Sequence, residues 1–293
     1  MARRVGKRSV GMPRVGDIEY QIVNDGRCLV DGGGAFGLVP RVIWEKRLPP
    51  DRNNFVPFVL RSLLVRSEGK SILVDTGYGH KLSPAQARNA GLVRGEEGDL
   101  IASLARIGVS PEDIDIVINT HLHSDHCSGN TRRVGDLVLP SFPRAQYVIQ
   151  RTEWEDATSP NERTRATYLP ENYEPLARGR QLSIVDGPAR ITGDVRTAVT
   201  RGHTRGHQVV VVESRGEAAI FLGDLATLHY HFERLAWVTA YDVEPLKSIE
   251  AKRFWQRWAL DRDALLIFQH DAQLCVGKLT PDGGHHKVVP IET

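Results

Sequence analysis

Four side chains that can bind a metal ion lie within six residues, in the run His121-Leu122-His123-Ser124-Asp125-His126. Imidazole nitrogens and carboxylate oxygens suit a borderline-soft divalent ion such as zinc, whereas magnesium and calcium prefer sites made of oxygen alone. Four ligands so close in sequence do not fit comfortably around one tetrahedral ion. The run therefore favours two neighbouring ions, and a solvated histidine-rich turn is the alternative.

Further metal-capable side chains follow apolar stretches that are typical of β-strands. Asp75 follows residues 72–74, Asp224 follows residues 219–222, and His270 follows residues 265–268. His203 and His207 lie just before a fifth, valine-rich stretch. Because sites in α/β sheets assemble at the carboxyl ends of strands, this placement predicts one shared site.

The elements that must position these residues alternate along the chain and predict an α/β fold. The expected strands cover residues 62–65, 71–74, 115–119, 146–149, 208–212, 218–222 and 264–268. Asp99 is expected to cap a helix that ends at Gly108, and a longer helix should follow Pro245. In that longer helix we expect Leu246, Ile249, Phe254 and Trp258 on one face.

Residues 17–293 are expected to form a single domain, with an insertion around residues 130–187 that is rich in Pro, Arg and Glu. Residues 1–16 are expected to form a basic, flexible arm or a subunit contact, because the first fourteen residues carry five basic side chains and no acidic one.

Composition excludes several classes of partner. The chain has 293 residues, with 38 Lys and Arg against 36 Asp and Glu, so its body is close to neutral and lacks the basic excess of a nucleic-acid-binding domain. No apolar run approaches the roughly 18 residues of a membrane span, and no apolar segment follows the basic start as in a secretory signal. Three widely spaced cysteines offer no disulfide framework, so we expect a cytoplasmic protein and a packing role for Cys127.

Five segments resemble the metallo-β-lactamase superfamily and follow its order. They are Val74-Asp75-Thr76-Gly77, the run from Thr120 to His126, Gly202-His203-Thr204-Arg205-Gly206-His207, Leu222-Gly223-Asp224 and Gln269-His270-Asp271. The resemblance implies an αββα sandwich, in which two packed mixed sheets are flanked by helices and a dinuclear metal site lies along one edge.

The resemblance also implies a role for each ligand. His121, His123 and His203 would hold one ion. Asp125, His126 and His270 would hold the other, and Asp224 would bridge the two. Asp75 and His207 would orient ligands without binding metal. We expect zinc, with iron, cobalt or manganese as alternatives that the same ligands accept.

Such a site implies a hydrolase. Two ions lower the pKa of a bridging water from about 15.7 to about 7, and the resulting hydroxide attacks a carbonyl carbon. Asp125 is placed to move a proton, so Asp125 and Asp224 are the candidate catalytic residues. No serine triad or thiol nucleophile is needed.

Within the superfamily, the chain resembles the lactonase and methyl-parathion-hydrolase-like branch. The segments that carry this likeness are residues 32–40 with Trp44, and residues 223–227 leading on to 241–245. Thr227 stands where the best-known acyl-homoserine lactonases have a tyrosine, which favours a broader activity on lactones and esters, with promiscuous activity on phosphotriesters. A thioester hydrolase similar to glyoxalase II, and a non-hydrolytic metal-binding or di-iron scaffold, are the alternatives.

We expect a small-molecule substrate (a lactone, ester or organophosphate), no nucleic-acid or membrane partner, and a homodimer. The side chains proposed to line the substrate pocket are Phe36, Leu38, Trp44, Trp154, Thr227, His229 and Tyr230.

Overall fold

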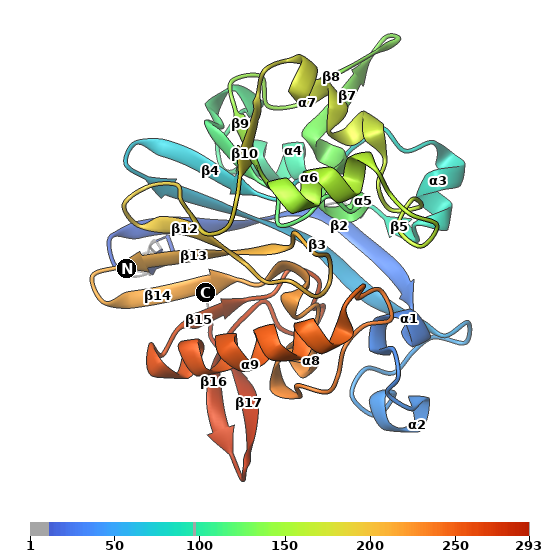
Figure 1. Ribbon diagram of the computed structural model, residues 1–293, viewed down its shortest axis with the longest axis vertical. Helices are drawn as coiled ribbons and strands as arrows, with labels where there is room; N and C mark the ends of the chain where they lie inside the picture. The colour runs from blue at the N-terminus through green and yellow to red at the C-terminus, as the bar shows by residue number, and fades with distance from the viewer. Residues whose placement is uncertain (1–11, 96–97, 293) are drawn as a thin grey trace, which may run out of the picture.

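The computed structural model describes residues 12–95 and 98–292, and within them the strands form two large sheets and one short hairpin (Figure 1). The first sheet consists of β1 (Arg14–Val15), β2 (Ile18–Asp31), β3 (Phe55–Ser67), β4 (Lys70–Val74), β5 (Leu92–Val93), β6 (Ile116–Ile118), β9 (Gln146–Gln150) and β10 (Leu182–Val185). Its strand order is β1-β2-β3-β4-β6-β9-β10, and β5 pairs with β2.

The second sheet runs in sequence order from β11 to β17. It consists of β11 (Ala189–Arg190), β12 (Val195–Val199), β13 (Gln208–Ser214), β14 (Glu217–Phe221), β15 (Leu265–Ile267), β16 (Val276–Asp282) and β17 (His285–Pro290). The separate hairpin pairs β7 (Thr131–Val134) with β8 (Leu137–Pro140). Both large sheets contain parallel and antiparallel pairs, so the expected mixed sheets are confirmed.

The helices are mostly short. They are α1 (Gly32–Phe36), α2 (Arg41–Trp44), α3 (Pro84–Asn89), α4 (Leu100–Arg106), α5 (Ser124–Cys127), α6 (Arg151–Thr158), α7 (Glu174–Arg178), α8 (His229–Glu233) and α9 (Pro245–Asp261), with 3₁₀ turns η1 (Pro111–Asp113), η2 (Ser128–Asn130), η3 (Pro170–Asn172) and η4 (Gly223–Leu225). Each helix in the described part of the chain is too short or too polar to cross a membrane.

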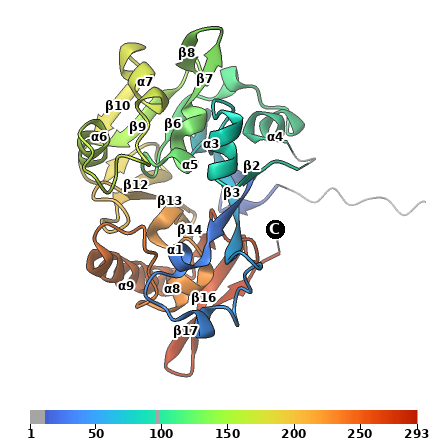
Figure 2. The same ribbon diagram turned by 90° about the vertical axis from the view of Figure 1, so that its right-hand side faces the viewer.

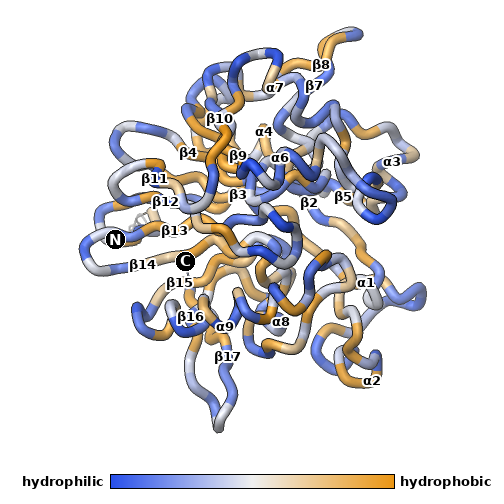
Figure 3. The backbone as a smooth tube through the Cα atoms, viewed as in Figure 1, coloured by the Kyte–Doolittle hydropathy of each residue, from blue (hydrophilic) through white to orange (hydrophobic). Residues whose placement is uncertain are grey.

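Alternation along β13 explains why the two sheets pack face to face. Val210 and Val212 belong to a buried cluster that joins both sheets, whereas Val209 and Val211 face the cluster under α9. Both faces of the strand are covered, so the sequence reads as a continuous valine run. In Figure 3 the strands of the sandwich are largely hydrophobic, while the loops at its rims are hydrophilic.

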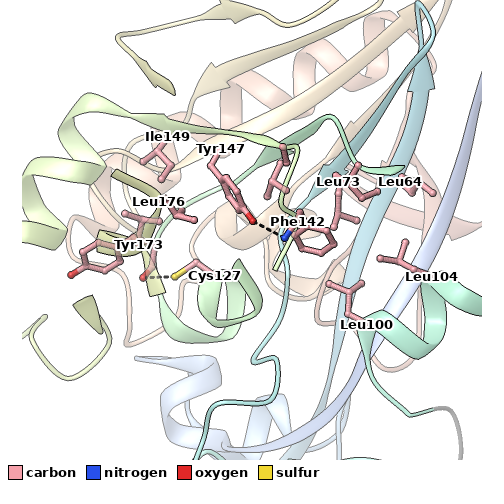
Figure 4. Close-up of a cluster of buried hydrophobic side chains, with 14 of the residues drawn as sticks. Leu64, Leu73, Leu100, Leu104, Cys127, Phe142, Tyr147, Ile149, Tyr173 and Leu176 are labelled. Carbon is pink, nitrogen blue, oxygen red and sulfur yellow. Dashed lines mark hydrogen bonds between the residues drawn. The ribbon is translucent and has the colours of Figure 1, made fainter. Parts of the chain in front are cut away.

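Helices α4, α6 and α7 cover the outer face of the first sheet (Figures 1 and 4). As expected, Asp99 caps α4 by accepting a hydrogen bond from the Ala102 amide at 2.9 Å. Cys127 is fully buried in this cluster, and burial raises the pKa of its thiol, so the expected packing role fits.

Helix α9 covers the outer face of the second sheet, but of the face predicted from the sequence only Trp258 is buried. Leu246 and Phe254 are exposed, and the buried residues include Ser248, Lys252 and Gln256 beside Trp255 and Trp258. Two of the polar members bond to backbone carbonyls: Lys252 donates to His231 and Trp237, and Gln256 donates to Phe232. A buried side chain with such partners does not follow the apolar periodicity.

Two boundaries differ from the sequence expectation. Residues 1–11 of the expected arm lie outside the described residues, but Arg14–Val15 already form β1, and Val15 is buried between the sheets. Within residues 130–187, β9 and β10 are strands of the first sheet, so only the β7–β8 hairpin stands apart from the sandwich.

The topology brings the functional segments to one edge of the sandwich. The parallel pair β4 and β6 ends just before Asp75 and Asn119, and the parallel pair β14 and β15 ends just before Leu222 and Phe268. Figure 2 looks onto this edge, where α1, α3 and α5 lie. The αββα sandwich is therefore confirmed, with its loops of interest gathered at one end of both sheets.

Candidate metal centre

The metal-capable side chains from all five segments meet at this edge. Their candidate ligand atoms form three groups in which all atoms lie within 4.8 Å of one another. These groups are His121, His123 and His203; His121, His126 and Asp224; and Asp125, His126 and His270. Seven residues from four separate segments of the chain thus form one continuous cluster of nitrogen and oxygen donors.

Asp224 lies between the two histidine groups. Its Oδ2 is 3.1 Å from His203 Nε2 and 3.5 Å from His126 Nε2, and its Oδ1 is 3.3 Å from His270 Nε2. On the two sides, His203 Nε2 lies 3.1 Å from His123 Nδ1, and His270 Nε2 lies 3.1 Å from His126 Nε2. The carboxylate can therefore contact two cations at once.

The donor set fits a divalent metal. His121 Nε2 is buried and has no hydrogen-bond partner among the described residues, which is costly by about 1–3 kcal/mol for a polar atom. It points into a cluster of imidazoles and carboxylates, the ligands that zinc and similar ions take. These residues are those expected of a site for divalent metal.

Two of the histidines are held in the neutral form that can bind metal. Burial, together with the neighbouring His126, lowers the pKa of His121 well below its usual value. Burial and the adjacent His203 do the same to His123. Both imidazoles are therefore neutral at pH 7, which is the form that binds metal.

Asp75 fixes the orientation of His126. Its Oδ2 lies 2.9 Å from His126 Nδ1, and its two oxygens accept hydrogen bonds of 2.7 Å from the amide and the hydroxyl of Thr120. Asp75 has a φ of +57°, a sparsely populated conformation that these contacts hold in place. With Nδ1 engaged, His126 presents Nε2 to the centre.

His207 supports the backbone of Asp224. The Asp224 amide donates to His207 Nε2 at 3.0 Å, which leaves the proton on Nδ1 to bond Thr200 Oγ1 at 2.5 Å. Burial and the nearby His203 lower the pKa of His207 to about 3. Gly223 allows this approach, because a Cβ at that position would lie 2.9 Å from His207 Nε2.

Two supports were not found from the sequence. Asp242 Oδ1 lies 3.0 Å from His203 Nδ1, and the carbonyl of Val59 accepts from His270 Nδ1 at 2.9 Å. Asp242 lies in a segment that the sequence did single out, and an aspartate near a proposed ligand loop was the available signal. A backbone carbonyl leaves no signal in the sequence.

A cavity of about 530 Å³ lies over the ligands, and it disagrees with most of the predicted pocket. Of the proposed lining residues, only Thr227 contributes to it, with a buried hydroxyl that has no hydrogen-bond partner. Phe36 and Trp44 instead stack on each other in the core at 4.7 Å between ring centroids, and Leu38 is 98% exposed.

The other three proposed pocket residues also face elsewhere. His229 bonds Asp271 and Tyr230 bonds Gln273, and both line a second cavity. Trp154, which lies on α6, packs against Tyr173 in the core. Aromatic residues near a ligand loop in sequence are thus used for packing, because the core gains more from burying them.

Different residues form the walls of the metal cavity. One side is apolar and includes Leu29, Phe55 and Phe58, whose ring stacks on His270 at 5.5 Å. The other side includes Tyr241 and Arg163. Arg163 is the one guanidinium or ammonium group among the described lining residues, and it already donates to the carbonyls of Ala240 at 2.7 Å and Asp242 at 3.1 Å.

Sequence comparison also identifies the family of the chain. Residues 57–245 match the profile of the metallo-β-lactamase superfamily. An N-acyl homoserine lactonase from a Bacillus species is 28% identical over 225 residues, which cover 72% of this chain and 80% of the relative. A second N-acyl homoserine lactonase, from Bacillus cereus, is 26% identical over 263 residues, which cover 85% of this chain and 91% of the relative.

Two solved structures share the whole architecture. A probable metal-dependent hydrolase from Staphylococcus aureus aligns with a TM-score of 0.86 and 30% identity, covering 96% of this chain and 99% of that one. The dizinc quorum-quenching lactonase AidC, solved with a product, N-hexanoyl-L-homoserine, aligns with a TM-score of 0.79 and 19% identity, covering 97% of each chain. At that identity, the second match speaks for the fold alone.

Proposed function

The chain belongs to the metallo-β-lactamase superfamily and is a lactonase-like metallo-hydrolase, and from this premise we propose that it opens lactone rings with two divalent metal ions, zinc in the first instance. The observation that carries the proposal is the position of Asp224, whose carboxylate lies between the two histidine groups, 3.1 Å from His203 Nε2 on one side and 3.3 and 3.5 Å from the Nε2 atoms of His270 and His126 on the other. A single ion would need only one of these groups.

We assign the ligands accordingly. His121, His123 and His203 would hold one ion, Asp125, His126 and His270 would hold the other, and Asp224 would contact both. When bound, such ions lower the pKa of water toward about 7 and polarise a carbonyl oxygen. Asp75, His207 and Asp242 keep the ligands in orientation through the hydrogen bonds described above.

Asp125 is the group we assign to proton transfer. It is the most exposed of the ligand carboxylates, with 26% of its side chain accessible, and it lines the cavity. Its Oδ2 lies 3.6 Å from His126 Nε2 and 3.7 Å from His270 Nε2, at the side of the cluster that meets the substrate space. From there it can accept a proton from the attacking water and pass it to the leaving alkoxide.

The charges of the cavity support a neutral substrate. Its walls carry Asp31, Asp125 and Asp224, and Arg163 is occupied by two backbone carbonyls. Both carbonyls bind the same nitrogen of Arg163, so among the described lining residues one partly engaged guanidinium stands against three carboxylates, which disfavours an anionic thioester of glutathione. A neutral lactone or ester with an apolar tail matches the apolar wall and the cavity volume of about 530 Å³, and a neutral phosphotriester is expected as a promiscuous substrate.

The test is a screen of metal-reconstituted protein against lactones, aryl esters, phosphotriesters and thioesters, ranked by kcat/KM, with a metal count in parallel. We expect about two ions per chain and the highest kcat/KM on lactones. Preference for a thioester, or a protein that binds no metal after metal-replete expression, would contradict the proposal. The homodimer and the cytoplasmic location expected from the sequence remain predictions.

A further inference from the structure

Glu153, near the start of α6, is a buried carboxylate that lies behind the metal centre. It is 1% exposed and accepts three hydrogen bonds. Its Oε1 accepts from the Leu122 amide at 2.8 Å and from the Tyr168 hydroxyl at 3.0 Å, and its Oε2 accepts from the Thr204 hydroxyl at 2.5 Å. Each of these donors belongs to a segment next to a proposed ligand.

The three donors identify what the carboxylate holds together. Leu122 lies between His121 and His123, and Thr204 directly follows His203. The ring of Tyr168 packs beside that of His123, with centroids 5.3 Å apart. One side chain therefore connects the two loops that supply the three-histidine group.

The packing of the second loop against α6 is equally close. A Cβ at Gly206 would lie 2.3 Å from the Glu153 nitrogen, so only glycine lets residues 202–207 lie against the helix. Burial raises the pKa of Glu153, and the bonds from Thr204, Leu122 and Tyr168 act against that rise. The network is fully satisfied, which is the condition under which a buried polar group holds a structure in one arrangement.

The other metal group is held by different contacts. Asp75 orients His126, and the Val59 carbonyl orients His270. Among the described residues, the hydrogen bonds of Glu153 go to neither His126 nor His270, although Leu122 lies in the same run as His126. The direct supports of the two histidine groups therefore differ, apart from Thr120, whose hydroxyl bonds Asp75 and lies 3.1 Å from His121 Nδ1.

We propose that Glu153 is a positioning residue that sets the three-histidine half of the metal centre and leaves the other half unaffected. This inference rests on the proposed dinuclear function. Partners that orient metal ligands typically change metal affinity by about 10–100-fold when they are removed, and we expect a change of that size for one ion only.

The experiment measures zinc affinity by competition with a chelator in two backgrounds, each with one half of the centre disabled. In His203→Ala, the remaining ion is held by Asp125, His126 and His270, and adding Glu153→Ala should change its affinity less than about twofold. In Asp125→Ala, the remaining ion is held by the three histidines, and adding Glu153→Ala should weaken it by about 10–100-fold. Glu155→Ala, an exposed glutamate on the same helix, is the matched control and should change neither.

Glu153→Gln provides a milder variant should the alanine variant fail to fold. Its amide can still accept from Leu122 and donate to Thr204, so it should restore most of the affinity that Glu153→Ala loses. Parental affinity for both ions in a folded Glu153→Ala protein, or equal weakening of both ions in either variant, would overturn the proposal. A parent protein that binds fewer than two ions would instead contradict the proposed function.

Discussion

The floor and the mouth of the cavity are built in different ways. At the floor, His121, His126 and Asp224 are buried, and each has a fixed partner: Thr120 Oγ1 for His121 Nδ1, Asp75 for His126 Nδ1, and His207 Nε2 for the Asp224 amide. At the mouth, Leu29, Phe55 and Tyr241 are 41%, 37% and 44% exposed. The difference indicates that the chemistry depends on a few buried side chains, each held by its neighbours. Substrate preference depends instead on exposed side chains, where substitutions disturb the fold less.

Within the floor, substitution of Asp224, the ligand assigned to both ions, should reduce activity most. We expect Asp224→Ala to lose metal and to lower kcat/KM on the best lactone by about 10³-fold or more, because the ions supply several kcal/mol of transition-state stabilisation. Metal analysis and steady-state kinetics check this, with Asp136→Ala, an exposed aspartate in the β7–β8 turn, as the control. Full turnover by a metal-free Asp224→Ala protein would refute the assignment.

Asp242 contacts the ligand His203 without being a ligand itself, so Asp242→Asn should have an intermediate effect on metal affinity. The amide oxygen can still accept from His203 Nδ1, but the negative charge that holds the imidazole is lost. We expect metal affinity to fall by about tenfold, toward the lower end of the range for such partners. Competition with a chelator measures it, and an unchanged affinity would show that the bond to His203 does not matter for metal binding.

Thr227 lies at the boundary between floor and mouth. Thr227→Tyr would fill part of the cavity beside Asp224, so we expect a folded protein, destabilised by about 1–3 kcal/mol, that keeps its metal. Its kcat/KM should fall about tenfold more for a long-chain lactone than for a short one. Thr227→Ser is the control, and equal losses on both substrates would argue that the position does not face the acyl chain.

At the mouth, the expected effect is smallest. Phe55→Ala removes part of an apolar wall that is already partly in water, so KM for an acyl lactone should rise about two- to fivefold with kcat unchanged. Leu38→Ser is the matched control, because Leu38 lies outside the cavity and should have no effect. A fall in kcat in Phe55→Ala would remove the distinction between floor and mouth.

The same contrast explains what could be predicted from the sequence. The strands before Asp75, Asp224 and His270 are short apolar runs that are recognisable locally, and parallel strands deliver their carboxyl ends to one edge. The positions of the ligands therefore followed from local pattern alone. The α/β class followed as well, because short apolar strands alternate with helices, and the αββα arrangement was implied by the resemblance to the superfamily.

The supports and the walls could not be predicted in this way. Glu153 and Asp242 are ordinary acidic residues until the tertiary structure brings them to the histidine loops. Phe36 and Trp44 resemble pocket residues in sequence, but each buries the other. The buried side of α9 carries Lys252, whose partners are backbone carbonyls that the sequence does not identify.

The engagement of Arg163 with the Ala240 and Asp242 carbonyls has a consequence for the end of the reaction. Opening a lactone turns a neutral molecule into a carboxylate. A hydrogen bond from Asn54 lowers the pKa of Asp31, so this carboxylate is ionised at the rim of the cavity at neutral pH. The neutral lactone experiences little electrostatic force on entry, whereas the product acid is attracted by the metal ions when bound and repelled by Asp31, so salt should affect departure more than arrival.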